Sequence, residues 1–396
     1  MAIDYAGARP ARTRRRSERA AAAGSLVRRL DLLLLGGVVS LVGYGLWAIG
    51  GITQADVVGD ENYFVVRQGV FACLGAIGLV AAVFVDPARY RIHRRLVFGT
   101  LVGILVLVLL AAELTRGSKR WIDLGFFQFQ PSEFGKLLFV LLIAGYLADR
   151  GRRVGEWSTV TAAVGLGLVP IVLVFAQPDL GTALVYGAAL GAALFIAGVR
   201  WLHLGALAGA TALVAVLILW ALPAAGVEVL KPYQGDRLTG FLNPGEDPSG
   251  STYNAQQSIV AVGAGGLRGR GVEGATQTNL AYLPEHATDF VFASLAEQRG
   301  FFGASGLLLL YLLVLWRGIR IVSVAPDGFT TIVAGGIVVA LLFQIFINVG
   351  MTMGIAPITG IPLPFVSVGG SSMISNLVAM GVLLGIAARG REAARR

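Results

Sequence analysis

Long apolar runs, each about as long as a membrane span, recur along most of this 396-residue chain. A helix needs about 20 apolar residues to cross the hydrocarbon core of a bilayer. Inside lipid each backbone polar group must be satisfied within its own segment, which favours helices for runs of this length. The sequence therefore predicts an all-α polytopic membrane protein with about ten transmembrane helices, near residues 31–50, 64–85, 96–113, 134–148, 157–176, 182–199, 203–223, 301–316, 329–350 and 370–388.

The composition supports a membrane protein and argues against several other classes. Charged residues make up 14% of the chain, against about 25% in soluble domains, and the mean hydropathy is +0.74. The one cysteine, Cys73, lies inside an apolar run, and the histidines have no metal-ligand spacing. A net charge of +9 would suggest nucleic acid in a soluble protein. Here the basic residues follow the membrane instead, so we expect no nucleic-acid partner.

The positions of the basic residues predict the topology. With the N-terminus inside, arginines concentrate in the inner segments, as the positive-inside rule requires. We therefore expect both termini to be cytoplasmic. The predicted domains are a basic cytoplasmic tail (1–29), a single ten-helix membrane domain (30–390) and a cytoplasmic C-terminal tail (391–396). Three polar loops then lie outside, at 114–133, 224–300 and 351–369, and the largest joins the seventh and eighth helices.

Two carboxylates stand where the largest polar loop returns to apolar sequence. Glu285 and Asp289 are four residues apart in the segment Leu283–Phe290. An ionisable group at a membrane boundary is costly to desolvate, which indicates a functional site. In the alternative interpretation, Asp289 caps the following helix and Glu285 is solvated loop.

The first outer loop leads into a helix with a charged pair. Pro131 suits the first helical position, and Glu133 complements the dipole of the first turn. Glu133 and Lys136 share a face and can pair, either as a functional ion pair or as a structural tether. Trp121 is placed like an interfacial anchor. Asp179, in a later hairpin, is expected to cap the helix that follows it.

A glycine-dense stretch, residues 263–271, lies in the large loop and contains Arg268 and Arg270. Residues 269–274 formally match the GxGxxG dinucleotide pattern, but no βαβ unit surrounds them, so we reject that interpretation. Glycine amides beside two arginines could still cradle a phosphate. A flexible re-entrant turn is the alternative.

A proline-rich segment follows the ninth predicted helix. Pro357, Pro362 and Pro364 fall within eight residues and forbid a regular helix there. Irregular backbone at membrane depth is tolerated only when it is buried in protein or lines a wet cavity. The segment therefore predicts a cavity that opens outward.

Taken together, these motifs resemble the shape, elongation, division and sporulation (SEDS) family, the RodA/FtsW membrane glycosyltransferases of bacterial wall synthesis. The resemblance runs from about residue 30 to residue 388 and rests on a specific set of motifs. They are Lys119-Arg120-Trp121-Ile122, Gln130-Pro131-Ser132-Glu133 with Lys136, Gln177-Pro178-Asp179-Leu180-Gly181, the glycine loop, Leu283-Pro284-Glu285 with Thr288-Asp289-Phe290, and Pro362-Leu363-Pro364-Phe365 with Gly369-Gly370-Ser371.

The resemblance implies a role for individual residues. In the family the aspartate that matches Asp289 is the essential catalytic residue, and positions matching Trp121, Glu133 and Lys136 are associated with function. The chain departs from the family at two places: Ala287 stands where the family usually has histidine, with His286 one place earlier, and Val368 stands where it usually has tyrosine. The motif Pro362-Leu363-Pro364-Phe365 resembles the RodA sequences more than the FtsW sequences.

The implied activity is polymerisation of lipid II into glycan strands for cell-wall elongation, with inversion and release of undecaprenyl diphosphate. We expect Asp289 to be the general base, and charge on the leaving diphosphate to be offset by basic residues and a divalent cation, Mg²⁺ or Mn²⁺. The expected substrate-binding residues are Arg120, Trp121, Glu133, Lys136, Gln257, Ser258, Arg268, Arg270, Glu285 and Thr288.

The resemblance also implies a setting and a partner. We expect the bacterial cytoplasmic membrane, an active site facing outward, contact with membrane lipids, and a class B penicillin-binding protein as partner. The alternatives are a lipid II flippase, an FtsW-type division polymerase, and a scaffold that only docks other proteins.

Overall fold

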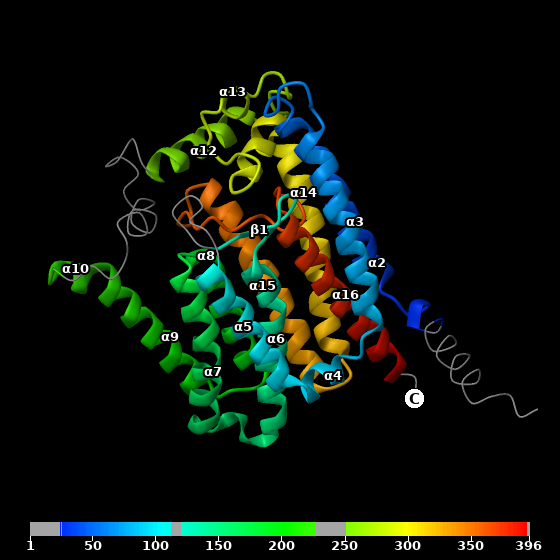
Figure 1. Cartoon of the computed structure of the whole chain (residues 1–396), viewed down its shortest axis with the longest axis vertical. Coiled ribbons are helices and arrows are strands. Elements are labelled where there is room, and N and C mark those ends of the chain that lie inside the picture. The colour runs from blue at the N-terminus through cyan, green and yellow to red at the C-terminus, as the bar shows by residue number, and fades with distance from the viewer. Residues whose placement is uncertain (1–23, 25, 112–119, 227–250, 394–396) are drawn as a thin grey trace, which may run out of the picture.

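The computed structural model describes residues 24, 26–111, 120–226 and 251–393. Most of the predicted basic tail, and parts of the loops 114–133 and 224–300, lie outside these residues. The described elements, with the labels of Figure 1, are α2 (Leu32–Ile52), α3 (Tyr63–Phe84), α4 (Pro87–Ile92), α5 (Arg94–Ala111), β1 (Ile122–Asp123), β2 (Gln128–Phe129), α6 (Pro131–Arg150), η1 (Gly151–Gly155), α7 (Trp157–Ala176), α8 (Leu180–Ile196), α9 (Trp201–Val216), η2 (Leu217–Ala221), α10 (Leu222–Ala224), α12 (Ser251–Gly265), α13 (Thr276–Asn279), α14 (Val291–Val324), α15 (Gly328–Thr352) and α16 (Gly370–Ala393).

The predicted all-α membrane fold is confirmed. Within the described ranges, eight helices are long and apolar enough to cross a membrane. The remaining two predicted spans correspond to α5, which begins with two arginines, and to the shorter apolar helix α8. The sheet structure of the described residues is one small antiparallel hairpin, in which β1 pairs with β2.

The helices pack into a bundle around α15 and α16. α16 runs along α3, and α15 contacts α6, α8 and α14. Buried side chains from α2 to α16 form one hydrophobic cluster. Figure 1 shows α9 and α10 leaning away from the bundle, and none of the apolar window of the Trp201–Ala224 span is buried. That segment is the part of the described chain most available to lipid.

The predicted outer loop 224–300 contains regular structure, and the predicted start of the eighth span near residue 301 is wrong. Its described part contains α12, α13 and the start of α14, which begins at Val291 rather than near residue 301. Gly300 has a φ of +66° and divides α14 into two parts. A Cβ at Gly300 would lie 2.3 Å from the backbone nitrogen of Gly269, so only glycine fits this close crossing.

An ion-pair cluster joins the two ends of the described chain. Asp31 caps α2 by accepting the N–H of Leu34 (3.0 Å). The same carboxylate accepts hydrogen bonds from Arg317 of α14 and from Arg391 of α16, the latter at 2.7 Å. The start of α2 and the end of α16 therefore lie at the same face of the bundle, as the topology prediction requires.

Asp31 is almost fully buried, and its ionisation depends on these partners. Burial by itself raises the pKa of the carboxyl, but the Arg317 and Leu34 hydrogen bonds and the charges of Arg317 and Arg391 together lower the pKa below its ordinary value. The ionised Asp31 carboxylate therefore contributes to the free energy of unfolding at neutral pH, and this contribution is lost as the pH falls through the acid range.

We predict that Asp31→Asn destabilises the protein by about 1–3 kcal/mol, because it removes the buried carboxylate that accepts charged hydrogen bonds from the partly exposed Arg317 and Arg391. Asparagine can still cap α2, so the stability lost in this variant reports on the ion pairs and not on the helix cap. Thermal unfolding in detergent measures it. The matched control is Asp327→Asn at the capping box of α15, where the carboxylate bonds only its own helix start and little change is expected. Equal shifts for the two variants would contradict the role of the ion pairs.

Candidate functional site

The segment Leu283–Phe290 folds into a compact turn just before α14. Glu285 has a φ of +55°, and its carbonyl oxygen accepts the N–H groups of Thr288, Asp289 and Phe290 at 3.1 Å each. The Thr288 hydroxyl donates to the Glu285 carboxylate at 2.9 Å. Glu285 and Asp289 are both partly exposed. The residue at the N-cap of α14 is Phe290, with no side-chain cap, so Asp289 is not the N-cap residue that the alternative interpretation required.

The turn is fastened to the proline-rich segment through its backbone. The carbonyl oxygen of Ala287 accepts the N–H of Val368 at 2.9 Å. The hydroxyl of Ser367 donates to the carbonyl oxygen of Thr288 and accepts the N–H of Leu363 at 2.8 Å. Ala287 and Val368, the two positions that differ from the family pattern, are thus direct neighbours. The two departures alter a single contact region and leave Asp289 in place.

The proline-rich segment is irregular, as predicted, and most of it is buried in protein. Gln68 of α3 donates to the carbonyl oxygen of Ser367 (3.0 Å) and accepts the N–H of Gly369 (3.1 Å). The Tyr311 hydroxyl donates to the carbonyl oxygen of Pro364. These side chains satisfy backbone groups that have no helix partner, which explains how irregular backbone is tolerated here. The outward cavity predicted at this segment stays a prediction.

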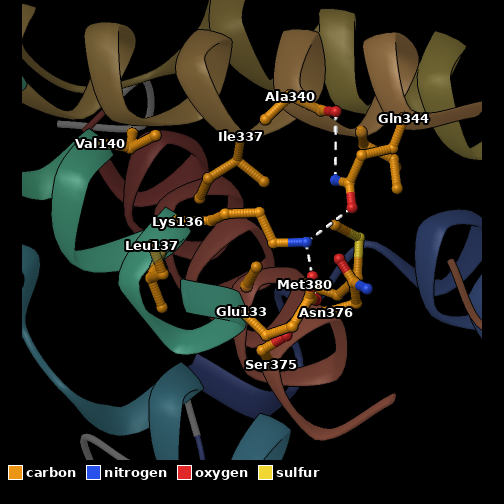
Figure 2. A pocket seen from close by; sticks show the side chains of 12 residues that line it. Glu133, Lys136, Leu137, Val140, Ile337, Ala340, Gln344, Ser375, Asn376 and Met380 are labelled. Carbon is orange, nitrogen blue, oxygen red and sulfur yellow. Dashed lines mark hydrogen bonds and ion pairs between the residues drawn. The ribbon is translucent and has the colours of Figure 1, made fainter. Parts of the chain in front are cut away.

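Glu133 and Lys136 form the predicted pair at a small, partly open cavity (Figure 2). The Lys136 ammonium donates to the Glu133 carboxylate at 2.7 Å and to the Gln344 side-chain oxygen at 2.6 Å. The cavity holds about 30 Å³, room for a water molecule. Ser375 and Asn376 of α16 also line it. Glu133 and Lys136 are nearly fully buried and compensate each other within α6, and the Lys136 hydrogen bond to Gln344 ties α6 to α15.

A second polar network surrounds Asp179 at the start of α8. Asp179 caps α8 through the N–H of Thr182 (3.2 Å), which confirms that prediction. It also accepts hydrogen bonds from Gln130 (3.1 Å) and Ser132 (3.2 Å) and pairs with Arg120 at 3.7 Å.

Residues of the hairpin before α6 orient the charge of Arg120. The Arg120 guanidinium lies 4.8 Å from the centroid of the Trp121 ring. The indole N–H of Trp121 donates to the side-chain oxygen of Gln130 at 3.2 Å. The N–H of Gln130 donates to the Ser371 hydroxyl at 2.9 Å. The Arg120 network is therefore anchored to Ser371, in the first turn of α16, and the Asp289 turn to Ser367, just before this helix.

The glycine-rich loop does not offer its backbone to a phosphate. The N–H groups of Gly269, Arg270 and Gly271 donate to the carbonyl oxygens of Gly265, Glu297 and Gln298 at 2.8–3.0 Å. The phosphate-cradle hypothesis is therefore wrong for these amides, since the loop serves as the tight crossing at the α14 kink. Both arginine side chains are exposed, and Arg270 donates to the carbonyl oxygen of Ala264 at 3.1 Å.

The two substrate-binding candidates on α12 differ in exposure. Gln257 is partly exposed and stays a candidate. Ser258 is fully buried, and its hydroxyl donates to the carbonyl oxygen of Thr352 at 2.6 Å. Direct substrate contact by Ser258 is therefore contradicted, because the hydroxyl is used to anchor α12 to the end of α15.

Several residues that position the Asp289 turn were missed from the sequence. His286 contacts Asp56, in the turn between α2 and α3, at 3.0 Å. Glu297 is fully buried and accepts the N–H groups of Gln277 and Thr278, which fixes α13. Gln344 and Asn348 are polar residues four apart inside an apolar run, and that spacing was the available signal.

The donor groups of the described residues limit how the expected divalent cation could bind. Among the described residues, no three His, Cys, Asp or Glu side chains gather as a metal cage. Mg²⁺ is commonly held by one or two carboxylates together with substrate phosphates. Glu285 and Asp289 could therefore hold a divalent cation only together with phosphate groups of the substrate.

Comparison with known proteins identifies the family. The model of a family described as Cell cycle protein, which covers FtsW, RodA and SpoVE, matches residues 29–392, and the chain belongs to this family. Stage V sporulation protein E of Bacillus subtilis is 38% identical over 90% of this chain and 96% of its own length. The peptidoglycan glycosyltransferase MrdB of Escherichia coli is 36% identical over 79% of this chain and 82% of its own.

Solved structures show the same fold. A chain from a peptidoglycan synthase complex, described as coordinating polymerisation and crosslinking, superposes with a TM-score of 0.77 at 30% identity and covers 93% of this chain and 99% of that one. RodA of Thermus thermophilus superposes with a TM-score of 0.65 at 28% identity, over 90% and 96% of the two chains.

We predict that the buried Glu133–Lys136 pair is energetically coupled. Lys136→Met leaves the Glu133 carboxylate buried without its counter-charge and should destabilise by about 3–5 kcal/mol. Adding Glu133→Gln should restore about 1–3 kcal/mol of that loss. Thermal unfolding of the two single variants and the double variant in detergent measures the coupling.

The exposed Arg153–Glu156 pair, with the same spacing of three residues, is the matched control. Its double-mutant cycle should show little or no coupling, because solvent screens both charges. Additive effects at Glu133 and Lys136 would contradict the structural importance of the buried pair.

Proposed function

We propose that this protein is a peptidoglycan glycosyltransferase that polymerises lipid II into glycan strands. The observation that carries the proposal is the rigid, partly exposed turn that presents Asp289 beside the proline-rich segment. Family membership and the glycosyltransferase names of relatives such as MrdB and FtsW support the same activity.

The proposed chemistry is a single inverting displacement. The sugar 4-hydroxyl of one lipid II attacks the anomeric carbon of another, the new glycosidic bond forms, and undecaprenyl diphosphate leaves. Asp289 accepts the proton of the attacking hydroxyl as general base. One displacement converts an α-linked donor into a β-1,4-linked product, so no covalent enzyme intermediate is needed.

The leaving diphosphate needs positive charge, and the candidates differ in what they can offer. Lys136 is already neutralised by Glu133 in a buried pair, so its part in the proposal is to hold α6 against α15 through its hydrogen bond to Gln344. Arg120 also has a carboxylate partner, since it lies 3.7 Å from Asp179. It is nevertheless the favoured candidate, because its network and the Asp289 turn are anchored within residues 367–371. Arg268 and Arg270 are exposed, and within the described residues neither pairs with that turn. A divalent cation would be shared between the diphosphate and Glu285 or Asp289.

The protein is an integral membrane protein, and we propose that the Asp289 face lies outside the bacterial cytoplasmic membrane. The cluster of Asp31, Arg317 and Arg391 lies at the opposite end of α2, α14 and α16, where the positive-inside rule favours arginine. We further propose a class B penicillin-binding protein as partner. The match to a chain of a peptidoglycan synthase complex supports such an assembly.

We predict that Asp289→Asn reduces glycan synthesis from purified lipid II by about 10²–10⁴-fold, the usual contribution of a general base. Glycan length on gels, measured in detergent with the partner present, is the readout, and it separates a polymerase from a flippase because transport has no meaning there. The control is Asp60→Asn, an exposed acid in the turn between α2 and α3, which should keep full activity. Full activity of Asp289→Asn would refute the assignment, and glycan absent even with the unaltered protein would refute the function.

A further inference from the structure

One helix face carries three buried polar residues in an otherwise apolar helix. Gln344, Asn348 and Thr352 of α15 follow each other at intervals of four residues and therefore lie along one side. They are 2%, 0% and 0% exposed. Burying polar groups is unfavourable unless they are hydrogen-bonded, so this α15 polar stripe needs partners.

Each residue of the α15 polar stripe contacts a different element of the candidate site. The Gln344 side chain accepts from Lys136 on α6 at 2.6 Å. The Asn348 amide donates to the Asp289 turn, and the carbonyl oxygen of Thr352 accepts from α12 at 2.6 Å. α15 thus acts as a common frame for elements that are far apart in the sequence.

Asn348 makes the contact closest to the proposed chemistry. Its Nδ2 group donates to the carbonyl oxygen of Asp289 at 2.9 Å and to that of Ile361, in the proline-rich segment, at 2.8 Å. Both hydrogens of one amide are thereby used to hold two irregular backbones together. Its Oδ1 atom is buried without a hydrogen-bond partner in the described structure. Such an unsatisfied atom costs about 1–3 kcal/mol, so the orientation of the amide is dictated by the two carbonyls.

We propose that Asn348 is a positioning residue for the transfer reaction. It fixes the backbone of Asp289 against the proline-rich segment, so that the carboxylate stays at the distance that proton transfer requires. This inference rests on the proposed function. A displacement of about 1 Å can cost on the order of 100-fold in rate while substrate binding is unchanged. The effect should therefore fall on kcat and leave KM unchanged.

The test compares two buried amides. Asn348→Leu removes both hydrogen bonds and keeps the branching and the number of heavy atoms of the side chain. Gln177→Met is the matched control, because Gln177 is also fully buried, donates one hydrogen bond to the carbonyl oxygen of Leu105 (2.9 Å) and has an unpartnered Oε1. Asn348→Asp is a second variant, which keeps the shape but loses both donors. Lipid II consumption is followed against substrate concentration, with thermal unfolding recorded in parallel.

We expect both apolar variants to lose thermal stability, and both Asn348 variants to lose about 10- to 100-fold in kcat with KM within about twofold. Gln177→Met should keep kcat. A kcat equal to that of the unaltered protein in either folded Asn348 variant would overturn the inference, as would a parallel loss of kcat in Gln177→Met. The unaltered protein and Asp289→Asn are assayed alongside. Activity in the first and its loss in the second show that the proposed function holds, so a failure at Asn348 would concern the positioning role alone.

Discussion

Buried backbone that is neither helix nor strand must find hydrogen-bond partners in protein, and this requirement shapes the end of the bundle that carries Asp289. Side chains from neighbouring helices supply the partners. Gln68 of α3 bridges Ser367 and Gly369, and Asn348 of α15 joins Asp289 to Ile361. Because these bonds reach backbone atoms, they fix the path of the chain and leave the Asp289 side chain at a partly exposed turn.

The buried carboxylates and the carboxylates of the Asp289 turn have different surroundings. Glu133 is matched by Lys136 inside the bundle, and the buried Asp31 is matched by two partly exposed arginines of α14 and α16. The Asp31 pairs hold three helices together, and Lys136 reaches α15 through Gln344. Glu285 and Asp289 are instead carried on a short, tightly hydrogen-bonded turn that remains partly exposed. A carboxylate in this setting can reach a ligand without moving buried helices. Burial with a counter-charge therefore marks the carboxylates that stabilise the bundle, and partial exposure marks those that can take part in catalysis.

Sequence reasoning succeeded where one physical rule decides the outcome. The need for about 20 apolar residues located the helices, and capping chemistry predicted the role of Asp179 and the start of α6 at Pro131. It failed where a polar residue is buried by distant neighbours. Glu297 and Gln298 were interpreted as loop, yet they lie inside α14 and bond α13 and α2. The glycine loop matched a phosphate-binding pattern, but its amides are used by α14. No local pattern predicts that His286 meets Asp56, because 230 residues separate them.

The central claim is that Asp289 acts on the acceptor sugar at the outer face of the bundle. The most direct measurement is a cryo-electron microscopy structure of the protein with its partner and two non-reacting lipid II analogues bound. The account predicts the acceptor 4-hydroxyl within hydrogen-bond distance of the Asp289 carboxylate, with the donor diphosphate on the side of Arg120. Both analogues seated away from the turn, or at the face marked by Asp31 and Arg391, would contradict it.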